Sequence, residues 1–151
     1  MLDSTDRRIL RHLQAEPSLS TTELADRCDL PVRSCSRRLD RMQDLGIIEG
    51  QEAIVDWSAL GYGVEVSLRF TLDKTQPRAF DEFLAAARLV PEVLEIQTFV
   101  GRVDVRLSVI ARDLPHYQQL YRDRILTLPH IADIESLMHI ARVKSDEALP
   151  V

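Results

Sequence analysis

Between residues 32 and 45, apolar side chains recur at every third or fourth position. They are Val32, Cys35, Leu39, Met42 and Leu45. A helix turns about 100° per residue, so all of these side chains fall within about 80° of Cys35 on one face. This spacing predicts an amphipathic helix that packs its apolar face into a core. Gly46 follows it, and glycine commonly ends a helix.

The opposite face of this predicted helix is basic. Arg33 and Arg37 lie near its pole, one turn apart, whereas Arg41 flanks the pole and Arg38 lies closer to the apolar boundary. Pro31 suits the first turn of a helix, although it has no side-chain oxygen that could cap it. The segment therefore combines a buried face with an arginine-rich face.

Two shorter helical patterns precede this one. The first begins where Asp3 or Ser4 is a candidate N-cap, and the second begins at Ser20, which forms a capping box with Glu23. A capped helix, a short turn and a second helix with a basic front are typical of the helix-turn-helix motif. We therefore predict that residues 1–46 form a helix-turn-helix domain that binds double-stranded DNA.

In such a motif the N-terminal residues of the second helix reach base edges in the major groove. Arginine suits this position because its guanidinium pairs with guanine O6 and N7. We expect Arg33 and Arg37 to read bases, and Arg38 and Arg41 to meet phosphates. The candidate DNA-binding residues are Arg33, Ser34, Ser36, Arg37, Arg38 and Arg41. The alternative is that these arginines are merely solvated on an exposed helix face.

The charge distribution favours a local DNA-binding surface over a broad one. The chain carries a net charge of −5, and its first 50 residues hold eight basic and nine acidic side chains, net −1. Residues 31–45 hold four arginines against Asp40 and Asp44, a local +2. The local field is what matters for docking, and here it is positive on the predicted second helix.

The two cysteines, Cys28 and Cys35, are too far apart for a CxxC pair, and the four histidines are scattered. We predict no metal site and no cofactor, and we expect both thiols to be buried as small apolar groups. No catalytic residues are predicted either, since the sequence has no nucleophile elbow, P-loop or GxGxxG motif.

After residue 46 the pattern changes from helical spacing to strand-like alternation. Residues 47–61 read as a linker strand and hinge, and residues 62–151 follow the order strand, helix, strand, strand, helix, strand. This is the order of a ferredoxin-like βαββαβ domain. The predicted fold class is therefore α+β, with an N-terminal helix-turn-helix domain joined by the linker strand to a βαββαβ domain.

Composition indicates an ordinary globular protein, with 45% hydrophobic and 28% charged residues. No apolar run approaches the roughly 20 residues that span a bilayer. No basic start followed by an apolar stretch marks a signal peptide. We expect a cytoplasmic protein with no membrane partner.

Several motifs are similar to those of one family, in order and spacing. Residues 2–13, "LDSTDRRILRHL", resemble an "LDxxDxxILxxL" opening, and residues 35–48, "CSRRLDRMQDLGII", resemble "CxRRLxRLxxxGxI". Residues 53–61, "AIVDWSALG", resemble a linker motif "AxxDxxxLG". Residues 101–113, "GRVDVRLSVIARD", resemble a "GxxD" turn followed by a strand and "ARD". Together they resemble the Lrp/AsnC (feast/famine) family of transcription regulators over nearly the whole chain.

This resemblance implies a transcriptional regulator whose βαββαβ domain dimerises and senses a small effector such as an amino acid. It also implies further assembly, for example into an octamer. The family binds effectors near the "GxxD" turn, which places candidate effector-binding residues at Gly101, Arg102 and Asp104. Residues 128–136, "LPHIADIES", resemble a closing "LPxVxxIxT" motif, and Ser136 is a further candidate because it matches the threonine of that motif. The alternative is that Gly101 only supplies a positive φ and Asp104 only caps the turn.

Three positions depart from the family pattern. Pro31 stands where the family often has a serine cap, His130 replaces a common glycine, and Val105 replaces a frequent aromatic residue next to the effector turn. Two other functions stay open at this stage. One is an enzyme like the sirohaem decarboxylases, which resemble the family in both domains. The other is an effector-sensing oligomer that does not bind DNA.

Overall fold

The computed structural model describes residues 1–145 and 147–151, and the chain forms two compact units. The first unit contains Met1–Ile54 together with Lys144–Val151, and the second contains Val55–Val143. We expected residues 62–151 to form one domain. Instead, Lys144–Val151 is grouped with the N-terminal helices, so the chain passes from one unit to the other twice.

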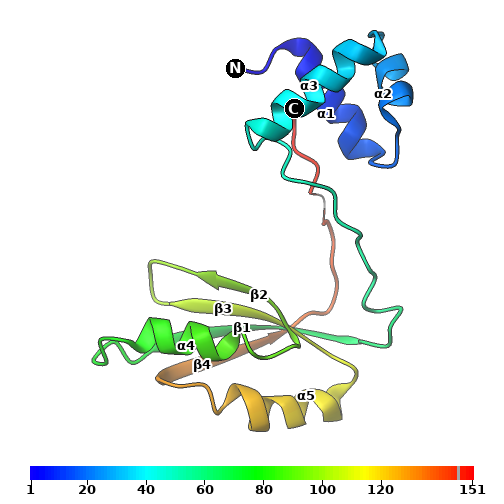
Figure 1. The fold of residues 1–151 in the computed structure, drawn as a ribbon. Coiled ribbons are helices and arrows are strands. Elements are labelled where there is room, and N and C mark those ends of the chain that lie inside the picture. Colours follow the sequence, from blue (N-terminus) through cyan, green and yellow to red (C-terminus); the bar gives the residue numbers. More distant parts are fainter. Residues whose placement is uncertain (146) are drawn as a thin grey trace. The chain divides into compact units, whose positions relative to one another are not determined.

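The first unit contains three helices: α1 (Ser4–Ala15), α2 (Thr21–Arg27) and α3 (Val32–Asp44) (Figure 1). Asp3 caps α1, and Ser20 caps α2 with Glu23 completing a capping box, as predicted. Pro31 precedes α3 and makes no side-chain cap bond. These are the three helices expected from the sequence.

The core of the first unit lies between the three helices. Its buried residues are Ile9, Leu10, Leu24, Ala25, Cys28, Cys35 and Met42. Both cysteines are free and fully buried, and burial raises the pKa of each thiol. The apolar stripe of α3 is confirmed at its centre. Its two ends, Val32 and Leu45, lie outside this core and are 43% and 61% exposed.

The expected linker strand is not present in this single chain. After α3 the backbone turns at Gly46, where φ is +67°, and β1 begins only at Val64. No described residue between 47 and 61 is in a strand, and residues 49–56 are exposed. A strand requires a neighbour that shares its backbone hydrogen bonds. No described segment of the chain pairs with residues 47–61 in this way.

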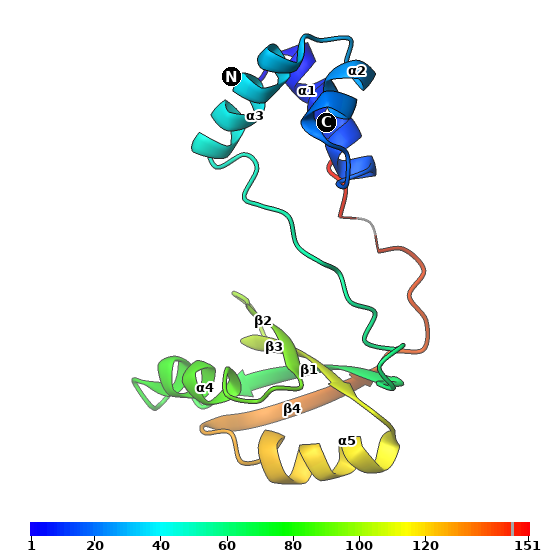
Figure 2. The same ribbon diagram turned by 45° about the vertical axis from the view of Figure 1, so that its right-hand side comes forward.

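The second unit is a four-stranded antiparallel sheet with the strand order β2-β3-β1-β4 (Figure 2). Its elements are β1 (Val64–Leu72), α4 (Ala79–Ala87), β2 (Val93–Thr98), β3 (Val105–Ala111), α5 (Leu114–Leu120), η1 (Tyr121–Ile125) and β4 (Ile131–Met138). This is the βαββαβ order, so the ferredoxin-like prediction is confirmed.

Both helices of the second unit cover the same face of the sheet (Figures 1 and 2). Alternate residues of β1 and β3 pack against Phe83 of α4 and Leu120 of α5, and Phe70 and Phe83 lie 4.9 Å apart between ring centroids. Helix α5 is followed directly by the π-type turn η1. The last strand ends at Met138.

Candidate functional site

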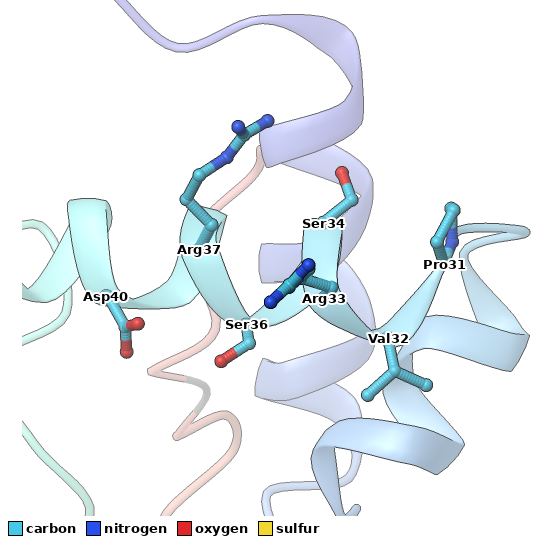
Figure 3. Close-up of a pocket in the computed structure, with 7 residues that line it drawn as sticks. All are labelled: Pro31, Val32, Arg33, Ser34, Ser36, Arg37 and Asp40. Atoms are coloured by element: carbon cyan, nitrogen blue, oxygen red, sulfur yellow. The ribbon is translucent and has the colours of Figure 1, made fainter.

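The basic face of α3 is exposed, as the sequence predicted. The guanidinium groups of Arg33 and Arg37 rise from successive turns of its N-terminal half (Figure 3). Neither has a hydrogen-bond or ion-pair partner among the described residues. Both side chains are therefore available to an external ligand.

The two candidate serines lie beside these arginines. Ser34 and Ser36 are partly buried, and each hydroxyl lies at the surface of α3 (Figure 3). They line one shallow hollow, whose residues are Pro31, Val32, Arg33, Ser34, Ser36, Arg37 and Asp40. Exposed apolar, hydroxyl and guanidinium groups thus occur together on a single helix face, a combination suited to thymine methyls, phosphates and guanine edges.

The other two candidate arginines are bound within the chain. A terminal nitrogen of Arg38 lies 2.7 Å from Asp3 and 2.7 Å from Asp6, and a terminal nitrogen of Arg41 lies 2.6 Å from Asp6. The side chain of Asp6 is completely buried, whereas that of Arg41 is 49% exposed. We call Asp3, Asp6, Arg38 and Arg41 the Asp6 cluster.

The Asp6 cluster joins α1 to α3. The Asp6 carboxylate also accepts a hydrogen bond from the backbone N–H of Asp3, so it completes the capping box of α1 and binds two arginines at once. The Asp6 backbone N–H and the Arg38 side chain lower the pKa of the Asp3 carboxyl to about 2. The same two carboxylates raise the pKa of Arg38. Arg38 and Arg41 therefore fix the position of α3, which sequence reasoning did not foresee.

The signal for this cluster was present in the sequence. Asp6 stands three and four residues before Ile9 and Leu10, so it falls on the apolar face of α1. An aspartate on a buried face requires a cationic partner. The helical wheel also places Arg38 near the apolar boundary of α3, which is the side that α1 covers.

The predicted effector turn, residues 101–104, joins β2 to β3, and its aspartate points inward. Asp104 is 3% exposed, and its carboxylate accepts a hydrogen bond from the Leu72 backbone N–H at 2.8 Å. The second oxygen lies 2.9 Å from the ammonium of Lys74. The Asp104 backbone N–H donates to the Phe70 carbonyl. Within this chain Asp104 therefore anchors the turn to the end of β1.

The tip of the same turn is exposed. Gly101 has a φ of +154°, a conformation that side-chain-bearing residues rarely adopt. Arg102 is exposed, and its carbonyl accepts a hydrogen bond from the Thr71 hydroxyl at 2.9 Å. The guanidinium of Arg102 has no hydrogen-bond or ion-pair partner among the described residues. The turn thus presents a free cation from a well-anchored backbone.

Ser136 lies apart from this turn. It belongs to β4, where it pairs with Leu68, and its hydroxyl accepts a hydrogen bond from Tyr117 at 3.4 Å. Burial raises the pKa of Tyr117. No hydrogen bond joins Ser136 to residues 101–104 in the part of the chain that the structure describes. Within one chain Ser136 is therefore bonded to α5 and not to the effector turn.

The described residues contain neither a candidate metal site nor a candidate membrane-spanning helix. No group of three or more His, Cys, Asp or Glu side chains lies close enough to hold a metal ion. Nor does any described helix combine the length and apolar character needed to cross a membrane.

Comparison with known proteins matches both units. A family model described as the Lrp/AsnC ligand binding domain matches residues 65–149, more than half of the chain. A model of a winged helix-turn-helix DNA-binding domain matches residues 2–49. The first match covers most of the sheet unit and also residues 144–149, and the second lies within the three-helix unit.

Individual relatives match over their whole length. The DNA-binding transcriptional activator DecR of Escherichia coli K12 is 30% identical over 154 residues, covering 100% of this chain and 99% of the relative. A transcriptional regulator of Neisseria meningitidis, solved in complex with L-methionine, superposes with a TM-score of 0.91 at 28% identity, covering 99% and 97% of the two chains. A feast or famine regulatory protein of M. tuberculosis, also complexed with L-methionine, gives 0.83 at 26% identity, covering 97% of each chain.

Proposed function

This chain belongs to the Lrp/AsnC family of transcriptional regulators, and from that premise we propose which of its residues carry out the regulation. It is a DNA-binding regulator with a helix-turn-helix unit and a ligand-binding unit. We assign base reading to Arg33 and Arg37. The single observation that carries this assignment is that both guanidinium groups are exposed and unpartnered on successive turns of α3.

The remaining candidates take supporting roles. Ser34 and Ser36 flank the two reading arginines and donate to phosphates or base edges. Arg41 is half exposed and keeps further N–H donors for a phosphate, while one nitrogen stays on Asp6. Arg38 lies deeper and is bound by two carboxylates. We therefore propose that it positions α3 and contributes less to phosphate binding than Arg41.

The DNA assignment is tested by selecting duplexes from a random pool with the full-length protein. A dimeric helix-turn-helix regulator should enrich two symmetric half-sites, spaced by about 10 base pairs or a multiple of that. Affinity for the selected duplex, measured by fluorescence anisotropy, should fall steeply with salt because bound phosphates release counterions. Recovery of only random sequences would contradict the proposal.

For the ligand-binding unit we propose an amino acid or a related metabolite as effector. Two similar regulators were solved with L-methionine, which makes amino acids the first class to test. The exposed Arg102 guanidinium and the turn amides would bind an α-carboxylate, since charged hydrogen bonds of this kind are strong. Asp104 serves to hold the turn, because both of its oxygens are occupied.

Ser136 enters this site only if a second copy of the chain contributes to it. Within the described part of one chain it makes no hydrogen bond to the 101–104 turn, and we propose a homodimer that assembles further, for example into an octamer. Analytical ultracentrifugation with and without effector measures this state directly. A monomer at all concentrations would contradict the proposed assembly and the shared site together.

A thermal-shift screen of the amino acids tests the effector site, since a ligand that binds only the native state raises its Tm. Arg102→Ala should abolish the shift given by a hit. Arg122→Ala is the matched control, because Arg122 is an exposed arginine on η1. A shift that survives Arg102→Ala would place the ligand elsewhere.

We also propose that the chain regulates without an enzymatic activity of its own, which the regulator relatives support. The competing hypothesis, an enzyme like the sirohaem decarboxylases, can be tested directly. Incubation with sirohaem should leave its absorbance spectrum unchanged, and appearance of a decarboxylated product would favour the enzyme.

A further inference from the structure

Residues 149–151 pack against α1, although the chain reaches them directly after the ligand-binding unit. The Leu149 backbone N–H donates to the Gln14 Oε1 atom at 2.6 Å, and the Gln14 Nε2 atom donates back to the Leu149 carbonyl at 3.3 Å. A terminal nitrogen of Arg11 donates to the backbone oxygen of Val151 at 3.1 Å. Arg11 and Gln14 stand three residues apart, so they share one face of α1.

Segment 149–151 contributes its backbone groups and one apolar side chain to these contacts. Val151 is partly buried and packs against the core of the three-helix unit. The Leu149 side chain is 67% exposed, so it is the Leu149 backbone that is recognised. A primary amide that both donates to and accepts from one residue fixes the register of the bound segment.

The preceding part of the chain is fixed to the other unit. The His139 backbone N–H donates to the Glu65 carbonyl, and Arg142 lies 2.7 Å from the Glu65 carboxylate. Glu65 belongs to β1 and Arg142 to the second unit. The chain therefore leaves an anchored position in the ligand-binding unit shortly before it reaches α1.

We propose that residues 149–151 form a clasp on α1 that gives the DNA-binding unit a second, non-covalent attachment to the ligand-binding unit. The first connection is the exposed segment 49–56, which has no helix or strand. A unit held by one such linker samples many orientations, and a second connection reduces them.

The clasp should affect the affinity of a dimer for duplexes with two half-sites. This expectation rests on the dimeric DNA-binding function proposed above. Once one helix-turn-helix unit of a dimer is bound, capture of the second half-site depends on the effective concentration of the other unit there. The clasp raises this concentration by restricting orientation. Its release should weaken binding to a two-half-site duplex and leave binding to a single half-site nearly unchanged.

Two substitutions at one position separate backbone docking from side-chain effects. Leu149→Pro removes the N–H that donates to Gln14, whereas Leu149→Ala keeps it. In the full-length protein, hydrogen exchange followed by mass spectrometry should show protection of the segment around residue 149 in wild type and in Leu149→Ala. The protection should be lost in Gln14→Ala, but not in the control Gln118→Ala on α5. Leu149→Pro has no amide at residue 149 to exchange, so this variant is read out by DNA affinity.

Anisotropy titrations on the selected duplex then measure the functional effect. Leu149→Pro and Gln14→Ala should lose about tenfold in affinity for the two-half-site duplex and less than about twofold for a single half-site. Equal losses on both duplexes, or no loss on either, would overturn the clasp. If wild type binds no duplex, the DNA-binding function fails, and exchange at wild-type residue 149 still decides whether the clasp exists.

Discussion

Removing the charge of Asp6 tests the structural role that we assign to Arg38 and Arg41. The Asp6 side chain is fully buried and carries three hydrogen bonds, one from the Asp3 backbone and one from each arginine. In Asp6→Asn the amide oxygen still accepts the Asp3 backbone N–H, but the buried negative charge between the two guanidinium groups is lost. The substitution is close to isosteric, so it isolates the electrostatic part.

The expected loss of stability in Asp6→Asn depends on how exposed Arg38 and Arg41 are. Breaking a fully buried ion pair by removing one charge costs about 3–5 kcal/mol. Here Arg38 keeps its bond to Asp3, and Arg41 is 49% exposed and regains water. We therefore expect Asp6→Asn to destabilise the three-helix unit by about 2–3 kcal/mol. In a unit of about 60 residues this lowers Tm by roughly 10–20 °C.

Scanning calorimetry of the full-length protein measures this change. Trp57 lies in the second unit, so its fluorescence gives a separate reading of a unit that should be unaffected. The control is Arg37→Ala, which removes an exposed arginine and should cost less than about 0.5 kcal/mol. If Asp6→Asn melted within about 2 °C of wild type, the Asp6 cluster would not be what holds α3 on α1.

Three further changes have outcomes set by single contacts. Asp104→Ala leaves the Leu72 N–H without its acceptor and should cost about 1–3 kcal/mol by urea unfolding, whereas Arg102→Ala should cost almost nothing. Gly46→Ala places a side chain at a φ of +67° and should destabilise the protein by about 1 kcal/mol, although the new Cβ meets no neighbouring atom. An unchanged urea midpoint would contradict this expectation. The folded pKa of Asp3, about 2, is below its ordinary 3.8, so its stabilisation is complete above about pH 4 and is lost as pH falls towards 2. Tm followed from about pH 5 to pH 2 should therefore fall less steeply in Asp3→Asn than in wild type.

Local patterns were sufficient to predict the elements of this fold. Capping residues and helical spacing located the three N-terminal helices, and alternation located the four strands of the sheet. The linker strand could not be settled in this way, because a strand depends on a partner as well as on its own residues. The docking of segment 149–151 could not be predicted for a related reason, since it depends on Gln14, 135 residues earlier.

In the candidate sites, the sequence predicts how residues lie on one helix but not which residues of other elements they contact. A helical wheel correctly separates the buried Cys35 from the exposed Arg33 and Arg37, since all three belong to one helix. It could not show that Arg38 and Arg41 are bound by α1, nor that Asp104 meets Lys74 across the turn. Ion pairs between elements are set by tertiary packing, which no single segment encodes.

The central claim is that Arg33 and Arg37 read DNA while the neighbouring arginines hold the helix. Competition anisotropy with the selected duplex and an equal-length random duplex measures it most directly. Arg33→Ala with Arg37→Ala should cost about 1–3 kcal/mol per arginine for the selected duplex, much less for the random one, and leave Tm unchanged. An unchanged preference for the selected duplex in this double variant would contradict the account.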